Sequence, residues 1–462
     1  MIDSKLQELE AKETNRLNND IELIASENYP SQDILDLLGS HFSVKYAEGF
    51  PKQVSKQGRH YAGCEIIDWL ENYAIEQATK LFKCKYANVQ PWSGSQANQA
   101  VYNAFLKPGD KVLAMDLDSG GHLTHVSKAS ATGKIYESEH YGLDKNGFLN
   151  YEEIKKKLYS FNPRLLVVGA SAYAREIDFK KIREIVDGYN LMIQCANGVI
   201  NGNEEEQVNE YKSKKCYLMV DMAHIAGLVA ADEHMSPLPY ADVVTSTTHK
   251  TLRGPRGGLI LWNDDDYCNK INNGVFPKTQ GGPNEAAIAA KAQCFIEAQS
   301  EEFKDYIRKV KYNVQCLIKG ISEFDAANRI KFVSGGSENH MVLLDIKDTG
   351  LTGAEAEELL ASYSIITNKN MISGDTKPSE CTGLRLGTAA ITTRGFTGEM
   401  CVDLGHLIAH ILLIGKKKEL PNGVTYVEDI LLLGKVKELL AKVGPFYTQF
   451  AANGDFSPSG LA

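Results

Sequence analysis

The sequence lacks an excess of positive charge. Its 462 residues carry 50 Lys and Arg against 59 Asp and Glu, which gives a formal net charge of −9. A protein that binds nucleic acid needs a basic surface for the phosphate backbone, so we do not expect this role. The sequence also lacks an apolar run of the ~18 residues that a membrane span requires, and no transmembrane helix is expected.

Paired cysteines and metal-ligand spacings are also missing. The nine cysteines form no Cys-x-x-Cys pair, and their odd number in a large chain predicts free thiols in a reducing compartment. The N-terminal segment MIDSKLQELEAKETNRL is charged and lacks the apolar core of a signal peptide. We therefore expect a cytoplasmic protein. No metal site is expected, because no Glu completes an HExxH motif with His406 and His410.

The sequence does contain short, continuously apolar runs that alternate with helical patterns. This alternation from Tyr61 to about Gly282 predicts an α/β domain whose mainly parallel sheet is covered on both faces. After about residue 290 the pattern changes to that of a smaller α+β domain. We predict an N-terminal helical arm over residues 1–25, a large domain over 26–290 and a C-terminal small domain over 291–462.

One segment resembles another part of the same chain. Leu191–Asn197 is similar to Leu218–His224, but only the second copy contains an Asp and a His. The stretch between them is polar and acidic, so residues 190–215 are interpreted as an insertion before the strand that carries Asp221. A surface loop is favoured over a disturbance of that strand, because a change in loop length costs little entropy.

Asp221 and Lys250 follow two neighbouring apolar runs. Acidic and basic residues at the carboxyl ends of strands lie where open α/β sheets bind ligands. This pair suits pyridoxal phosphate, with the lysine forming a Schiff base and the aspartate holding the pyridine nitrogen protonated. A buried Asp–Lys ion pair is the alternative interpretation.

Two further segments are candidates for binding a phosphate group. Ser93, Gly94 and Ser95 open a helical pattern, where backbone N–H groups and hydroxyls create an anion site. Gln280–Pro283 is glycine-rich and could bring more amides to the same phosphate. Alone, the first segment also fits a plain helix N-cap and the second a tight turn.

The motifs together resemble the serine hydroxymethyltransferase family of fold-type I pyridoxal-phosphate enzymes. That resemblance implies an aminotransferase-like large domain with a seven-stranded, mainly parallel sheet. The matching motifs run in order over residues 20–390: Ile24-Ala-Ser-Glu-Asn28, Lys45-Tyr-Ala-Glu-Gly49, Ser93-Gly-Ser-Gln-Ala-Asn98, Gly120-Gly-His-Leu-Thr-His125, Ser171-Ala-Tyr173, Val220-Asp-Met-Ala-His-Ile-Ala-Gly227, Thr247-Thr-His-Lys-Thr-Leu252, Gly254-Pro-Arg-Gly-Gly258, Gln280-Gly-Gly-Pro283 and Leu384-Arg-Leu-Gly387.

The resemblance also implies roles for individual residues. Catalytic roles go to Lys250, which would bind the cofactor covalently, and to His249, Tyr61 and the proton-transfer candidate Glu48. Cofactor-binding roles go to Ser93, Gly94, Ser95, His122, Ser171, Asp221, His224 and Gly282. Substrate-binding roles go to Ser26, Tyr46, Glu48, Tyr61 and Arg385, and folate-binding roles to Leu117, Gly121, His122 and Leu123.

The implied reaction is the reversible transfer of the serine hydroxymethyl carbon to tetrahydrofolate. It gives glycine and 5,10-methylenetetrahydrofolate through an external aldimine of pyridoxal 5′-phosphate. A homodimer is implied as well, because Tyr46, Glu48, Tyr61 and Gly282 would reach the active site of the partner chain.

The sequence departs from the family pattern around the loop expected near folate. Lys52–Gly58 is longer than the usual link, and His60 and Ala62 replace a Tyr and a Gly. Val126 also stands where a Gly is usual. These departures motivate an alternative, a folate-independent pyridoxal-phosphate aldolase or transaldolase acting on β-hydroxy amino acids. A non-catalytic relative is a third class, which would be expected to lose Lys250 or Asp221.

Overall fold

The computed structural model describes residues 2–197, 214–375, 377–414, 417–420, 423–426 and 430–445. The chain divides into two compact units. Unit 1 comprises Met1–Gln32 and Asp305–Ala462, and unit 2 comprises Asp33–Lys304. The divisions therefore fall at residues 32 and 304, whereas the sequence pattern placed them near 25 and 290.

Pairing and packing explain where the divisions fall. Strand β1 (Ile21–Glu22) pairs in parallel with β11 (Ile365–Ile366), which joins the N-terminal segment to the C-terminal part of the chain. Helix α11 (Glu285–Glu297) packs against α3 (Glu65–Phe82) and so remains with unit 2. Neither contact has a signal in local sequence periodicity.

A seven-stranded sheet forms the centre of unit 2, in the order β2-β8-β7-β6-β5-β3-β4. The pairs from β7 to β4 are parallel, and β8 runs antiparallel to both β7 and β2. This confirms the predicted mainly parallel seven-stranded sheet. The strands are β2 (Tyr86–Asn88), β3 (Lys111–Met115), β4 (Glu137–Tyr141), β5 (Leu165–Val168), β6 (Tyr217–Asp221), β7 (Val243–Thr247) and β8 (Gly258–Trp262).

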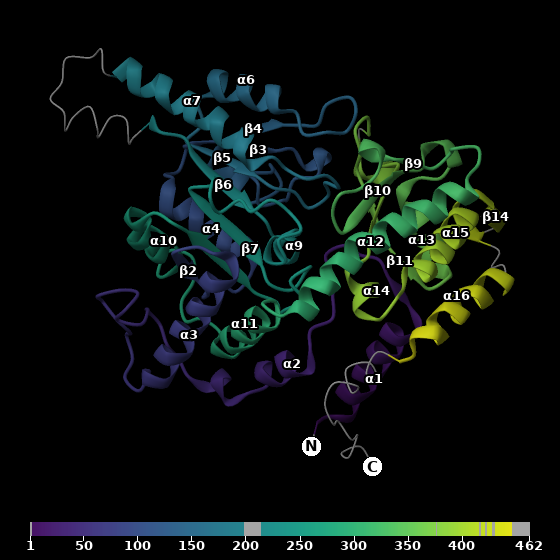
Figure 1. Cartoon of the computed structure of the whole chain (residues 1–462), viewed down its shortest axis with the longest axis horizontal. Helices are drawn as coiled ribbons and strands as arrows, with labels where there is room; N and C mark the ends of the chain where they lie inside the picture. The colour runs from purple at the N-terminus through teal and green to yellow at the C-terminus, as the bar shows by residue number, and fades with distance from the viewer. Residues whose placement is uncertain are drawn as a thin grey trace. The chain divides into compact units, whose positions relative to one another are not determined.

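Helices cover both faces of this sheet, so strands such as β5 are buried along their whole length. Figure 1 shows α6 and α7 on one side of the sheet and α4 and α10 on the other. The remaining helices of unit 2 are α4 (Gly94–Phe105), α5 (Thr132–Ile135), α6 (Tyr151–Phe161), α7 (Phe179–Asn197), α9 (Ala226–Ala230) and α10 (Cys268–Val275). Helices α2 (Gln32–Leu38) and α12 (Glu301–Phe324) each cross a division between the units.

The predicted insertion is partly helical. Helix α7 continues to Asn197, so residues 190–197 do not form a loop, and residues 198–213 lie outside the described part of the chain. Where the description resumes, Lys215 Nζ lies 3.2 Å from Asp242 Oδ1, and Arg183 Nη1 of α7 lies 3.0 Å from Asp242 Oδ2. These ion pairs lie beside the amino end of β6, whereas Asp221 is at its carboxyl end.

Unit 1 contains a four-stranded antiparallel sheet in the order β12-β13-β10-β9, together with helices. This is the smaller α+β fold that the sequence predicted for the C-terminal part. The strands of this sheet are β9 (Lys331–Phe332), β10 (Met341–Asp345), β12 (Asn368–Asn370) and β13 (Gly383–Gly387). Strands β14 (Lys417–Leu420) and β15 (Gly423–Tyr426) pair separately. Its helices are α1 (Ser4–Asn19), α13 (Gly353–Ser362), α14 (Ala389–Thr393), α15 (Gly398–Ile414) and α16 (Ile430–Val443).

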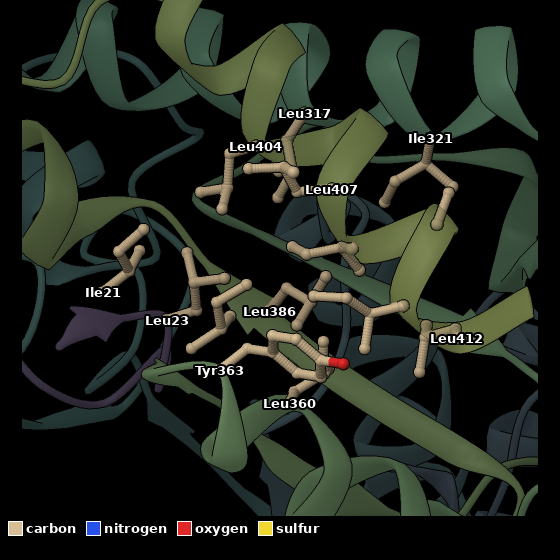
Figure 2. Packing of buried hydrophobic residues seen from close by; sticks show 14 of the residues in the cluster. Ile21, Leu23, Leu317, Ile321, Leu360, Tyr363, Leu386, Leu404, Leu407 and Leu412 are labelled. Carbon is tan, nitrogen blue, oxygen red and sulfur yellow. The ribbon is translucent and has the colours of Figure 1, made fainter. Parts of the chain in front are cut away.

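The core of unit 1 forms where α12 and α15 pack on the sheet. Figure 2 shows Leu404 and Leu407 of α15 close to Leu317 of α12, with Leu386 of β13 beside them.

Thr352 is the N-cap of α13 and forms a capping box. Its hydroxyl accepts from the backbone N–H of Glu355, and the Glu355 side chain accepts from the backbone N–H of Thr352.

Two smaller sequence features have structural explanations. His406 Nε2 lies 3.1 Å from Glu323 Oε2, and the ring of His410 stacks on Phe324, so both histidines contact α12. The nine cysteines are free thiols. Among the described residues, no helix combines the length and the apolar character needed to cross a membrane.

The core predicts how unit 1 responds to truncation. Leu404 is fully buried, so Leu404→Ala should lower the free energy of unfolding of unit 1 by about 2–5 kcal/mol. Leu6→Ala is the control, because Leu6 is 59% exposed and its loss should change stability by less than ~0.5 kcal/mol. Urea unfolding followed by circular dichroism measures both. Equal unfolding midpoints for the two variants would contradict this assignment of the core.

Candidate functional site

Two neighbouring parallel strands bring Asp221 and the segment before Lys250 to the same edge of the sheet. Asp221 ends β6 and is in register with Thr245 of β7, and Lys250 follows β7 by three residues. Lys250 is buried, with 9% of its surface exposed. Carboxyl ends of adjacent parallel strands are where α/β sheets bind ligands, so the position of both residues fits a ligand site.

Three donors hold the Asp221 carboxylate. Asn98 Nδ2 donates to Oδ2 over 2.9 Å, His125 Nε2 lies 3.1 Å from the same oxygen, and the N–H of Ala223 donates to Oδ1 over 3.1 Å. Burial alone would raise the pKa of Asp221, but the hydrogen bonds from His125 and Asn98 outweigh it, and the pKa is well below its usual range. Asp221 is therefore ionised at neutral pH.

The backbone fixes the tautomer of His125. The N–H of His122 donates to Nδ1 of His125 over 3.2 Å, so Nε2 carries the hydrogen that points at Asp221. The following residue, Val126, has φ 53° and is fully buried. A β-branched residue is strained in this left-handed region, which explains why a Gly suits the position.

His122 is held as a neutral ring. Its Nδ1 accepts from the N–H of Thr124 and lies 2.7 Å from the Thr124 hydroxyl, which in turn accepts from Asn98 Nδ2. Burial lowers the pKa of His122 to about 4, and the positive charge of Lys250 also lowers it, against the opposing effect of Asp221. His122 thus lies within the electrostatic reach of both Asp221 and Lys250, and it presents an uncharged face.

The predicted phosphate-binding residues form the first turn of α4. Ser93 is the N-cap, and its hydroxyl accepts from the N–H of Gln96 over 3.2 Å. The first N–H groups of a helix have no intrahelical partner, and they favour an anion. A Cβ at Gly94 would lie 2.6 Å from Thr247 Cγ2, so a larger residue would push this turn away from β7.

His249 precedes Lys250 in the segment after β7, and His224 lies in the turn after β6. Burial lowers the pKa of His249 to about 3, and the charges of Lys250 and Arg256 add to this effect, so the ring is neutral. The hydroxyl of Thr251 donates to the carbonyl of His224 over 2.8 Å, which ties the turn after Asp221 to the turn after Lys250.

The predicted folate loop is joined to Ser171. The N–H of Ser171 donates to the carbonyl of Gly120 over 2.8 Å, and a Cβ at Gly121 would lie 2.3 Å from the carbonyl oxygen of Met115. This close packing fixes the position of the loop, and the loop carries an exposed apolar side chain on either side of Gly121. Leu117 is 41% exposed and Leu123 is 49% exposed.

Tyr46, Glu48 and Tyr61 form a second cluster with the glycine-rich turn. The rings of Tyr46 and Tyr61 lie 5.3 Å apart, and the charge of Glu48 raises the pKa of Tyr61. Cβ atoms at Gly281 and Gly282 would lie 3.0 Å from Glu48 Oε1 and 3.2 Å from the Tyr46 ring. Tyr46 is 58% exposed and Tyr61 is 46% exposed, so this cluster faces solvent in the single chain.

Arg59 organises the backbone around Glu48, and the sequence analysis assigned it no role. Its Nη1 donates to the carbonyls of Ala47 and Gly49, the two neighbours of Glu48, over 2.9 and 2.8 Å. Its remaining nitrogens bond to Asp68 and Glu71. A guanidinium can do this because its five N–H groups have a fixed planar geometry.

Ser26 and Arg385 belong to unit 1. Arg385 lies on β13, its Nε donates to Asn368 Oδ1 over 3.1 Å, and burial lowers the pKa of its guanidinium to about 10. Ser26 follows a segment that packs on the end of the same strand, because the N–H of Gly387 donates to the carbonyl of Leu23 over 2.7 Å. A buried arginine suits a carboxylate ligand.

Sequence reasoning missed Asn98, Thr124 and His125 as partners of Asp221 and His122. Each lies inside a motif that the sequence analysis quoted, but their roles depend on contacts between α4, the loop after β3 and β6. The signal that could have found Asn98 is its spacing, four residues after Gly94 on the helix face that meets β7.

The pKa of His122 predicts a pH effect on stability. The folded protein protonates His122 only near pH 4, whereas the unfolded chain does so near 6.5, so stability falls as pH decreases through this window. At pH 5 the wild-type protein should take up about one proton at His122 when it unfolds, and His122→Phe should remove this proton uptake. Urea midpoints measured from pH 7 to 4.5 give this slope, with exposed His41→Phe as the control. A slope that is the same in wild type and His122→Phe would show that His122 is charged in the folded protein.

Known proteins resemble this chain over most of its length. Residues 1–204 and 205–408 match the family described as serine hydroxymethyltransferase. A serine hydroxymethyltransferase of Lactobacillus acidophilus is 48% identical over 403 residues, which cover 87% of this chain and 90% of the relative.

Two more relatives extend the comparison. A serine hydroxymethyltransferase of Helicobacter pylori is 46% identical over 89% of this chain and 91% of its own length. A probable serine hydroxymethyltransferase of Rickettsia bellii is 46% identical over 96% of this chain and 97% of its own length. Together with the sheet and the residues around Asp221, these matches show that the chain belongs to the serine hydroxymethyltransferase family, with the fold of fold-type I pyridoxal-phosphate enzymes.

Proposed function

We propose that this protein transfers the hydroxymethyl carbon of serine reversibly to tetrahydrofolate, giving glycine and 5,10-methylenetetrahydrofolate. The observation that carries the proposal is a largely buried, ionised Asp221 one strand away from the segment bearing Lys250. The names of the relatives support this reaction rather than a folate-independent aldolase.

The donor set fits pyridoxal phosphate. An ionised Asp221 would accept the hydrogen of the pyridine nitrogen and keep that nitrogen protonated. Neutral His122 would lie flat on the ring, and the first turn of α4 would bind the phosphate. Lys250 would anchor the cofactor covalently through Nζ. When bound, the cofactor supplies an electron sink for the bond broken at the amino acid Cα.

The residues of the chain then orient the substrates. Arg385 would bind the carboxylate of serine with two parallel N–H groups, assisted by Ser26. Glu48 would hold and move the proton at the hydroxymethyl oxygen, with Tyr61 beside it. Leu117 and Leu123 offer exposed apolar surface for the folate ring system, on a loop that Gly121 keeps close to β3.

A homodimer with shared active sites completes the proposal. Tyr46 and Tyr61 are exposed in the single chain although they belong to a cluster with catalytic side chains. The adjacent helix α3 exposes Ile66, Trp69 and Tyr73, which lie three and four residues apart on one face. The free cysteines support a location in the reducing cytoplasm.

Activity tests both the reaction and the role of Lys250. Serine should be converted to glycine at full rate only when tetrahydrofolate is present, and Lys250→Ala should lower kcat at least about a thousandfold. Exposed Lys278→Ala is the matched control and should retain activity. Conversion of serine at the same rate without tetrahydrofolate would overturn the proposal in favour of the aldolase.

Complementation tests the shared sites. Lys250→Ala and Glu48→Gln should each be inactive alone, but their mixed dimer contains one site with both wild-type residues. Co-expression should therefore recover about a quarter of wild-type activity, because half of the dimers are mixed and each has one intact site. Lys250→Ala with Asp221→Ala is the control, since both residues serve the same site and no activity should return. Recovery in the control, or its absence in the test pair, would contradict the arrangement.

A further inference from the structure

Lys291 is a buried lysine that the proposed chemistry does not use. It lies on α11 and is 1% exposed. Its Nζ donates to three backbone carbonyls, those of Val89, Pro91 and Gly258, over 2.6, 2.9 and 3.0 Å. All three hydrogens of the ammonium group are thereby used.

Two of these carbonyls, those of Val89 and Pro91, lie just before the phosphate-binding turn, and the third belongs to Gly258 at the start of β8. Pro91 precedes the N-cap Ser93 by two residues, and its carbonyl also accepts from the N–H of Gly258 over 2.9 Å. A Cβ at Gly258 would lie 2.3 Å from the carbonyl oxygen of Ser93, and a Cβ at Gly257 would lie 2.2 Å from Lys291 Cε. Lys291 is therefore closely packed against Gly257, and Gly258 is closely packed against Ser93.

The same contacts reach the turn that carries Lys250. The N–H of Thr248 donates to the carbonyl of Gly257 over 3.2 Å, and the N–H of Gly254 donates to the carbonyl of Thr248 over 2.7 Å. The Thr248 hydroxyl donates to the carbonyl of Pro255 over 2.5 Å. Lys291 therefore connects the start of α4 with the segment from Thr248 to Gly258.

The charge of Lys291 is only partly offset by its surroundings. Burial lowers the pKa of Lys291 to about 7, and the carboxyl groups of Glu71 and Glu285 act in the opposite direction. Glu71 is already bonded to Arg59 and Gln90, and burial raises the pKa of Glu285 to about 8. Within the described residues, the Lys291 ammonium lies on carbonyl oxygens rather than on a carboxylate.

We propose that Lys291 is a positioning residue for the cofactor phosphate. It fixes the Ser93–Ser95 turn relative to the turn that carries Lys250, and it adds positive charge near the phosphate site. This inference rests on the proposed function, because it requires pyridoxal phosphate as the ligand. If Lys291 contributed only to the stability of α11, its replacement would weaken binding of the cofactor without acting specifically on the phosphate.

Two ligands that differ only in the phosphate test this role. The apo dimer is titrated with pyridoxal 5′-phosphate and with pyridoxal, and the ratio of the two dissociation constants gives the advantage conferred by the phosphate. In Lys291→Met, which keeps the length of the side chain without its charge, that advantage should fall at least about tenfold. Ile288→Ala, a buried truncation one turn earlier on α11, should lose stability but keep the wild-type ratio.

A second variant guards against misfolding. If Lys291→Met does not fold, Lys291→Gln retains an amide donor for the carbonyls and removes the charge, and its ratio should also fall. A wild-type ratio in the folded variant, or parallel weakening of both ligands, would overturn the inference. Failure of the wild-type protein to bind pyridoxal phosphate would instead refute the proposed function, so the two failures are distinguishable.

Discussion

The ionised carboxylate of Asp221 is the interaction on which the site depends. A largely buried carboxylate is costly unless donors satisfy it, and here Asn98, His125 and the N–H of Ala223 do so. Asn98 also accepts from the Thr245 hydroxyl on β7 and donates to Thr124. The same side chain therefore joins α4, two strands and the loop bearing His122, and the charge of Asp221 is built into the packing of unit 2.

The fold places this site at the opposite end of β6 from the predicted insertion. Asp242 accepts from Arg183, Lys215, the Tyr267 hydroxyl and the N–H of Leu218, all beside the amino end of β6. This network connects Arg183 of α7 with Lys215 and the amino end of β6. Asp221 is at the opposite end of the same strand, where Asn98 of α4, His125 and the N–H of Ala223 hold its carboxylate.

The sequence predicted the sheet, because continuous apolar runs such as Leu165–Val168 are distinctive for strands buried on both faces. It also predicted Asp221 and Lys250, since polar residues at strand ends are a local signal. The unit boundaries could not be predicted, because the parallel pairing of β1 with β11 joins residues more than three hundred positions apart. For the same reason His125 was missed, because its partner Asp221 lies 96 positions further along the chain, on β6.

The most direct test of the account is the protonation state of the cofactor nitrogen beside Asp221. Pyridoxal phosphate labelled with ¹⁵N in its ring, bound to the wild-type protein at neutral pH, should give the chemical shift of a protonated pyridine nitrogen. Asp221→Asn, which keeps the shape of the side chain without its charge, should give that of an unprotonated one. An unprotonated nitrogen in the wild-type protein would contradict the claim that an ionised Asp221 organises this site.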